Sequence, residues 1–343
     1  MNTRKWMLPS LLMTLVLLGG ACGDDDDDPV AGQDGTTTTT EALPEFPAGS
    51  TMAKIQEKGK IVVGTKFNQL GSGIKNPATG ELEGFDIEIA KLVAVGIFGG
   101  TVEEVEDKIE FKETITGVRE SAIQIGDVDM IAATYTINDA RKQQVDFAGP
   151  YVIDGQTVMV ESDNTTIKAL TDLNGKKVCT GRGSTTPANL TAKQIKPSEL
   201  VLRDSYPECA DELRQDRVEA VVSDRGILLG LVEQSQRAFK LLDIDVSEEP
   251  LGIGLKKGDD AFRDFINDRL EAIYESGEWA KAYEATYGKL GLATPQPPAV
   301  DRYPTTGTST IKATTTVPAS TTTTGGATTT TTTTTTSMAN TTR

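Results

Sequence analysis

Residues 130–160 constrain the fold of this chain more than any other stretch. They open with an apolar run, Met130–Thr134, which predicts a buried strand. Asn138 can cap a short helix after this strand. Extended chain is expected again at Val145–Phe147 and, after a Gly-Pro break, at Gln156–Val160. Strands that alternate with a helix in this way indicate an α/β fold.

Side chains that can bind a carboxylate gather at the end of the first of these strands. Thr134 and Thr136 offer hydroxyl donors, and Arg141 follows at the start of the predicted helix. Because a guanidinium group is a planar fork, it can bind a carboxylate through two parallel hydrogen bonds. An arginine in a first helical turn is more commonly a solvated surface residue, so the pattern alone leaves both interpretations open.

The same stretch resembles the signature of the family 3 extracellular solute-binding proteins, which deliver amino acids to ABC importers. The family pattern T-x-T-x-x-x-x-R-x-x-x-V-D-F-x-x-P-Y-x-x-x-G-Q is matched over 134–156, and a second pattern, G-F-[DE]-[IV]-[DE]-[IL]-A, over Gly84–Ala90. The resemblance covers about residues 48–292. Within the family it is strongest to the glutamate-binding lipoproteins of Gram-positive actinobacteria, through 64–77, 129–138 and two downstream cysteines.

The resemblance implies a two-lobed periplasmic-binding-protein fold of type II. Two α/β sandwich lobes are joined by two hinge strands, and the ligand binds between lobes that close over it. The expected organisation is a signal peptide at 1–21, a disordered acidic and Thr-rich tether at 22–47, a discontinuous lobe 1 at 48–152 and 250–292, lobe 2 at 153–249, and a Thr-rich disordered tail at 293–343.

The composition excludes several classes of function. The net charge of −16 argues against binding to nucleic acid or, by charge, to anionic lipid. The chain has no histidine, which excludes histidine catalysis, histidine metal sites and a histidine pH switch. We expect no metal, no cofactor and no enzymatic activity. An enzyme of the same fold, such as a cyclohexadienyl dehydratase-like lyase, and an extracellular sensor domain are the alternatives.

The N-terminus predicts export. A basic start precedes the apolar run Trp6–Leu18, which is short for a membrane helix, and small residues then lead to Cys22. This order resembles a bacterial lipobox, in which Cys22 would carry lipid and hold the protein on the outer face of the cell membrane. Gly19 stands where such sites prefer leucine, and Gly19-x-Ala21 would also suit ordinary signal peptidase, which would release a soluble protein.

Both ends of the chain have compositions that cannot build a core. The acidic run Asp24–Asp28 leads into a Thr-rich segment, and the chain after Tyr303 is nearly all threonine. Too little apolar surface is available there to offset the entropy of ordering. We therefore expect a disordered tail, whose composition also permits O-glycosylation, and we expect truncation after Thr294 to leave affinity and melting temperature nearly unchanged.

Two cations in the first half of the chain are further candidates for the ligand site. Lys66 follows a buried strand at 60–65, and open α/β sheets bind ligands beyond the carboxyl ends of their strands. Arg119 lies in the first turns of a helix expected at 116–125. By pattern alone, Lys66 could be a solvated loop residue and Arg119 a partner in a surface ion pair. The resemblance implies that both contact the side-chain carboxylate of the ligand.

The second lobe offers a glycine-rich loop and an acid. The loop at 181–187 opens a helix, and a helix N-terminus presents free N–H groups to an anion, although a plain tight turn would also suit it. The resemblance implicates Gly183, Ser184 and Thr185 in contacts with the α-carboxylate. Asp224 ends a predicted strand and can cap the next helix. The resemblance implies that it accepts hydrogen bonds from the ligand's α-ammonium group.

Cys179 and Cys209 favour a disulfide over two free thiols, because the chain is predicted to be exported. Closing a loop of this length would stabilise the protein by roughly 3–4 kcal/mol in the chain-entropy model. A cysteine-metal site is unsupported, because no other soft ligand is near in sequence.

These observations predict a monomeric extracellular lipoprotein that binds L-glutamate, or L-aspartate, and passes it to the permease subunits of an ABC importer. Arg141 would bind the α-carboxylate, Asp224 the ammonium group, and Lys66 and Arg119 the side-chain carboxylate. The sum of these four charges is positive, which favours an anionic ligand over neutral glutamine.

Overall fold

The computed structural model of the protein describes residues 43–303. The α-helices are α1 (Thr51–Lys58), α2 (Phe85–Phe98), α3 (Val102–Val105), α4 (Arg119–Gln124), α5 (Asp139–Lys142), α6 (Thr186–Ala192), α7 (Tyr206–Arg214), α8 (Arg225–Gln234), α9 (Asp260–Ser276) and α10 (Glu278–Ala285). The strands are β1 (Ile61–Thr65), β2 (Asn68–Gln69), β3 (Gly73–Lys75), β4 (Leu82–Glu83), β5 (Ile109–Glu113), β6 (Met130–Ile131), β7 (Asp146–Glu161), β8 (Lys177–Gly181), β9 (Glu199–Arg203), β10 (Ala220–Asp224), β11 (Phe239–Leu241) and β12 (Ser247–Leu255).

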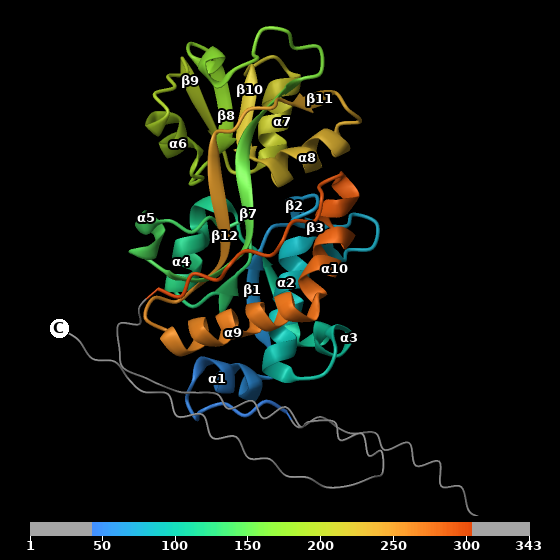
Figure 1. The fold of residues 1–343 in the computed structure, drawn as a ribbon, viewed down its shortest axis with the longest axis vertical. Helices are drawn as coiled ribbons and strands as arrows, with labels where there is room; N and C mark the ends of the chain where they lie inside the picture. Colours follow the sequence, from blue (N-terminus) through green and yellow to red (C-terminus); the bar gives the residue numbers. More distant parts are fainter. Residues whose placement is uncertain (1–42, 304–343) are drawn as a thin grey trace, which may run out of the picture. The chain divides into compact units, whose positions relative to one another are not determined.

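Two long strands connect the lobes (Figure 1). The main sheet has the order β5-β1-β6-β12-β7-β10-β8-β9, with β11 on β7, and β2-β3-β4 form a small separate sheet. β7 and β12 pair antiparallel from Ser247 opposite Gln156 to Leu255 opposite Asp146. The sequence predicted two extended segments around Gly149-Pro150, whereas the structure has one strand of 16 residues. The ladder is interrupted only locally, where the register of β12 shifts between Leu251 and Ile253.

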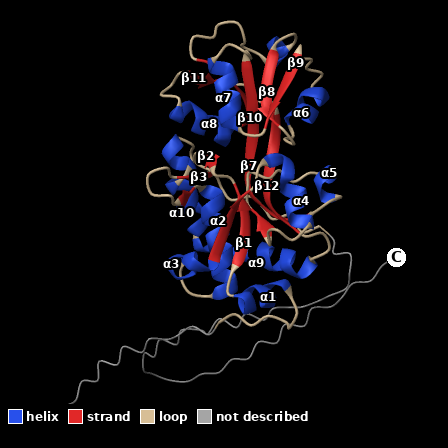
Figure 2. Ribbon diagram, turned by 180° about the vertical axis from the view of Figure 1, so that it is seen from behind, coloured by secondary structure: helices blue, strands red, loops and turns tan. Residues whose placement is uncertain are grey.

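Helices cover both faces of the sheet in each lobe (Figure 2). Such a sheet is buried on both sides, which is why all five residues of β1 are buried rather than every second one. In lobe 1 the larger core lies under α1, α2, α9 and α10, and the smaller core lies under α4. In lobe 2 one core lies under α7 and α8 and the other under α6. The carboxyl ends of β1 and β6 are left facing lobe 2.

The N-terminal boundary of lobe 1 lies earlier than predicted. The ring of Phe46 packs edge-on against Phe265, with 5.3 Å between ring centroids. Gln56 Nε2 donates a hydrogen bond of 2.9 Å to the carbonyl oxygen of Pro44. The tether expected at 22–47 therefore ends before these residues, because Phe46 finds an apolar surface on α9 that local composition could not reveal.

The C-terminal boundary predicted at residue 292 is also wrong. Residues 293–303 run along lobe 1 without regular secondary structure (Figure 1). Val300 packs against the core of lobe 1, and the Asp301 N–H donates to the Gly149 carbonyl oxygen at 2.8 Å. The segment forms no helix or strand, and it contacts lobe 1 through individual residues such as Val300 and Asp301. Its sequence therefore has no periodic pattern that could have predicted this contact. We call residues 297–303 the strap.

Lobe 2 contains the predicted disulfide. Cys179 in β8 is bonded to Cys209 in α7, with 5.5 Å between their Cα atoms. The bridge fastens α7 to the sheet inside one of the two lobe 2 cores.

The predicted signal peptide, the lipidation site Cys22 and the chain beyond Tyr303 lie outside the described residues. Between residues 43 and 303, no helix has the length and apolar character needed to cross a membrane.

Candidate ligand-binding site

Most of the predicted ligand residues meet in one small cavity between the lobes. Its lining includes Arg119, Thr134, Thr136, Arg141, Ser184, Thr185 and Asp224. A second small cavity is lined by Lys66 and shares Thr116 and Tyr206 with the first. Residues as far apart in sequence as Lys66 and Asp224 therefore line two neighbouring cavities.

Arg141 is positioned by a one-turn helix. The Asn138 side chain accepts a hydrogen bond from the Arg141 N–H at 2.9 Å, which caps α5 as the sequence predicted. The guanidinium Nη1 donates to the Thr136 carbonyl oxygen at 2.7 Å. Its Nη2 donates to the Gly183 carbonyl oxygen of lobe 2 at 3.0 Å. Arg141 is only 7% exposed, so the solvated alternative is wrong.

Arg119 is buried at the base of the first cavity, and the surface ion-pair alternative is also wrong. Its Nη1 donates to the carbonyl oxygens of Ala133 and Thr134 at 3.0 and 3.1 Å. Its guanidinium carbon lies 4.1 Å from the centroid of the Tyr135 ring. Burial and the neighbouring charge of Arg141 lower the pKa of Arg119 to about 10. Backbone carbonyls, rather than a carboxylate, hold this charge.

Lys66 is held in the same manner. Its Nζ donates to the Thr114 carbonyl oxygen at 2.7 Å and to Thr116 Oγ1 at 3.1 Å. Among the described residues, no carboxylate comes within 4.0 Å of this ammonium group. Burial, followed by the charge of Arg119, lowers the pKa of Lys66 well below its ordinary value. An anion bound beside Lys66 would offset both the desolvation of its charge and the repulsion from Arg119.

Asp224 lies on the opposite side of the first cavity, at the end of β10. It occupies the N-cap position of α8, yet its carboxylate makes no capping bond. Asp154 of β7 accepts from the Gly226 N–H at 3.0 Å instead. Asp224 Oδ1 accepts from Gln156 Nε2 at 3.3 Å. The capping alternative for Asp224 is thus wrong, and its carboxylate remains available to the cavity.

Sequence reasoning missed the acids that surround Asp224. Glu249 in β12 is 1% exposed and accepts hydrogen bonds from Thr185 Oγ1 at 2.9 Å and from Asn189 Nδ2 at 2.7 Å. Burial, together with the charges of Asp154 and Glu249, raises the pKa of Asp224 well above its ordinary value. The four-residue charge sum made from the sequence therefore omitted acids that share the site. Asp154 and Glu249 lie near Asp224 because β7 and β12, the hinge strands, carry them there.

A further buried acid, Asp86, lies near Lys66 and Arg119. Asp86 Oδ2 accepts from the Thr134 N–H at 2.9 Å, and Oδ1 accepts from the Tyr151 hydroxyl at 2.6 Å. Thr134 has a φ of 44°, which is rare for a β-branched residue, and these bonds help to hold it. Burial raises the pKa of Asp86 to about 6. These contacts give Asp86 a structural role in lobe 1.

The glycine-rich loop brings lobe 2 close to lobe 1. Gly183 has a φ of 78°, and a Cβ atom there would lie 3.0 Å from the Cα atom of Gly117. Its neighbours Ser184 and Thr185 line the first cavity, and the Thr185 hydroxyl also accepts from Gln156 Nε2 at 2.8 Å. Only a glycine permits this close approach of two backbones.

Comparison with known proteins identifies the family. The sequence model of the bacterial extracellular solute-binding proteins, family 3, matches residues 61–289. The chain belongs to this family. It is similar to the glutamate-binding protein GluB of Corynebacterium glutamicum, with 36% identity over 68% of this chain and 80% of that protein. It is equally similar to the glutamine-binding protein GlnH of Bacillus subtilis, with 36% identity over 68% of this chain and 83% of the other.

A solved structure agrees with this assignment. An ancestral arginine-binding protein bound to glutamine has a TM-score of 0.59 and 35% identity, covering 67% of this chain and 98% of that one. The predicted family and fold class are therefore confirmed, and the protein is an extracellular binding protein rather than an enzyme.

Proposed function

We propose that this solute-binding protein binds a free L-amino acid between its lobes and delivers it to the permease subunits of an ABC importer. The observation that carries the proposal is the separation of charge across the first cavity. Arg141 and Arg119 line one side, and Asp224 lines the other. On this proposal Arg141 and Thr136, with Gly183, Ser184 and Thr185, bind the α-carboxylate, and Asp224 binds the ammonium group. Both sides then gain a counter-charge.

We further propose that the side chain of the ligand is acidic, with glutamate preferred to aspartate. Lys66 supports this, because its buried charge is paired only with neutral oxygens at the edge of the second cavity. Arg119 and Thr134 line the first cavity and complete the side-chain site. The relatives support either glutamate or glutamine, because GluB is named for one and GlnH for the other. The choice therefore depends on Lys66.

Calorimetric titration of the protein, after unfolding and refolding to remove any bound ligand, tests both proposals. Glutamate is expected to bind more tightly than aspartate, and glutamine at least about tenfold more weakly, which corresponds to about 1.4 kcal/mol. Equal affinities for glutamate and glutamine would overturn the acidic assignment. Absence of heat with every amino acid would overturn the amino-acid proposal itself.

Anchoring is a separate proposal. We propose that Cys22 carries lipid and holds the monomeric protein on the outer face of the cell membrane, because the basic, apolar and small-residue order of the N-terminus ends at this cysteine. Mass spectrometry of the membrane fraction should detect a diacylglycerol adduct on Cys22. A mature protein secreted with an unmodified Cys22 at its N-terminus would contradict it.

A further inference from the structure

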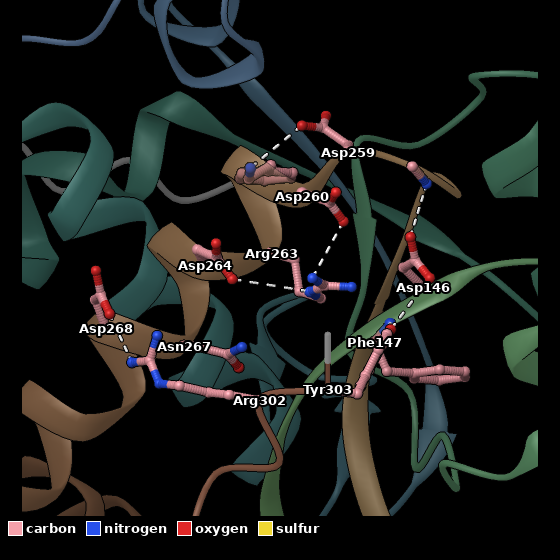
Figure 3. A network of polar contacts seen from close by, with 12 residues as sticks. Asp146, Phe147, Asp259, Asp260, Arg263, Asp264, Asn267, Asp268, Arg302 and Tyr303 are labelled. Atoms are coloured by element: carbon pink, nitrogen blue, oxygen red, sulfur yellow. Dashed lines mark hydrogen bonds and ion pairs between the residues drawn. The ribbon is translucent and has the colours of Figure 1, made fainter. Parts of the chain in front are cut away.

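The strap contributes Arg302 and Tyr303 to a network of polar contacts near the start of β7 (Figure 3). The Tyr303 hydroxyl accepts from the Phe147 N–H at 2.8 Å and donates to Asp146 Oδ1 at 3.2 Å. Asp146 Oδ1 also accepts from Lys257 Nζ at 2.8 Å. One aromatic residue of the strap thus contacts the strand that leads from lobe 1 into the hinge.

The network of polar contacts extends to Lys142, the last residue of α5. Lys142 Nζ pairs with Asp301 Oδ2 at 3.0 Å and lies 4.4 Å from the centroid of the Tyr303 ring. The Lys142 carbonyl oxygen accepts from Lys257 Nζ at 2.6 Å. Lys142 is therefore held at both its side chain and its backbone, and it directly follows Arg141 in sequence.

On its other side the strap is fixed to α9. Arg263 lies 4.3 Å below the Tyr303 ring and is only 2% exposed. Its Nη2 lies 3.1 Å from Asp260 Oδ1 and its Nε lies 3.9 Å from Asp264 Oδ1, and the face of the Tyr303 ring adds to these two ion pairs. Arg302 pairs with Asp268 at 2.6 Å (Figure 3). It also pairs with Glu271 at 2.8 Å, and both acids are on α9.

Helix α5 needs such support. It has four residues, which is one turn, and a single turn is not stable by itself. Its N-terminus is capped by Asn138, but its C-terminus is held by Lys142, Lys257 and the strap. A small rotation of this turn would move the Arg141 guanidinium relative to the cavity.

We propose that the strap is a positioning element of the ligand site, which holds α5 through Lys142 and so keeps Arg141 aimed into the cavity. The strap lies beyond the part of the chain that matches the family, residues 61–289. The inference rests on the proposed function, in which Arg141 binds the α-carboxylate. Because every amino acid has this group, loss of the strap weakens all ligands by the same factor.

Two truncations of the full chain test the inference. A stop after Thr294 removes the strap, and a stop after Thr305 is the matched control that keeps it. Composition alone predicts unchanged affinity for the first truncation, but the contacts of the strap change this expectation. It should weaken the binding of glutamate and glutamine alike by about five- to tenfold, measured about 20 degrees below the melting temperature, with the glutamate-to-glutamine preference unchanged. The control is expected to match the full chain. A lower melting temperature with unchanged affinities would show a purely stabilising strap and overturn the inference.

Combining the truncation with Arg141→Lys separates this inference from the proposed function. If the strap acts through Arg141, the truncation has less effect in the Arg141→Lys background than in the native one. Equal effects in both backgrounds would overturn the inference and leave the proposed function intact. An Arg141→Lys protein with native affinity would instead overturn the role of Arg141.

If the truncated chain does not fold, Tyr303→Ala is compared with Tyr303→Phe, which keeps the aromatic ring of the strap. Equal affinities of these two variants would overturn the inference.

Discussion

The two sides of the ligand site hold their charges by different means. On the lobe 1 side, Lys66 and Arg119 are paired with backbone carbonyls and a threonine hydroxyl. On the other side, Asp224 and Glu249 are paired with side-chain amides and hydroxyls. Because neutral partners do not cancel a buried charge, each side retains a demand for the opposite charge. Charge separation, rather than net charge, is what the site can recognise, and a zwitterion satisfies both sides.

The largest effect is expected when the lobe 1 side loses its α-carboxylate contact. Arg141→Ala should weaken glutamate, aspartate and glutamine alike by about a hundredfold or more, because charge-assisted hydrogen bonds contribute about 1.5–3 kcal/mol each. Calorimetry measures the affinities, and a thermal melt confirms that the variant is folded. Native affinity for any of these ligands would contradict the proposed role of Arg141.

A smaller and selective effect is expected at Lys66. Lys66→Met should weaken glutamate by about ten- to a hundredfold and glutamine much less, because the amide cannot use the charge. Lys112→Met is a matched control, since Lys112 pairs with Asp127 on the exposed edge of the same lobe. Equal losses for the two ligands would mean that Lys66 does not read the side chain.

Both the stability of the protein and its affinity for the ligand should depend on pH through Asp224. The raised pKa of Asp224 means that the ligand-free protein binds this proton more tightly than the unfolded chain does. The Asp224 contribution to stability is therefore present at low pH and is lost as the pH rises through the folded pKa. Ligand binding needs the carboxylate, so affinity should fall as the pH is lowered through the same range.

Glu249→Gln sharpens this test, because it removes a like charge while keeping a side chain of the same shape. The pKa of Asp224 should then move toward its ordinary value, and the acid limb of affinity should move to lower pH. Affinity near neutral pH should change by only about three- to tenfold. Titrations between pH 4 and 8 measure both effects. An acid limb that stays in place in the variant would show that Glu249 does not influence Asp224.

The smallest effect on affinity is expected at the disulfide. Replacing Cys179 and Cys209 by alanine should lower the free energy of unfolding by roughly 3–4 kcal/mol. Affinity should remain within about twofold of the native value, because neither residue lines the two cavities and the bridge lies inside lobe 2. Denaturant titration and calorimetry measure the two quantities. A large loss of affinity would mean that the bridge shapes the site.

The sequence predicts best where function depends on local patterns. Arg141 follows a capping asparagine and sits in a long motif, and the structure places it beside the other predicted residues. Glu249 could not be found, because its position depends on the pairing of β12 with β7, two segments far apart in the chain. The strap has no periodicity, and its contacts are made by single side chains such as Tyr303. Patterns of period two or 3.6 cannot report such docking.

The strap and the Phe46 contact also determine how the protein carries a mechanical load. Both ends of residues 43–303 are fastened to α9 of lobe 1, Phe46 through Phe265 and Arg302 through Asp268. A pull on the N-terminal end enters the molecule through this helix, whereas a pull on the C-terminal end also enters through β7, because Asp301 and Tyr303 are bonded to that strand. Neither attachment lies in lobe 2, which is joined to lobe 1 through β7 and β12. A load on the ends of residues 43–303 is therefore taken up by lobe 1 and the start of β7.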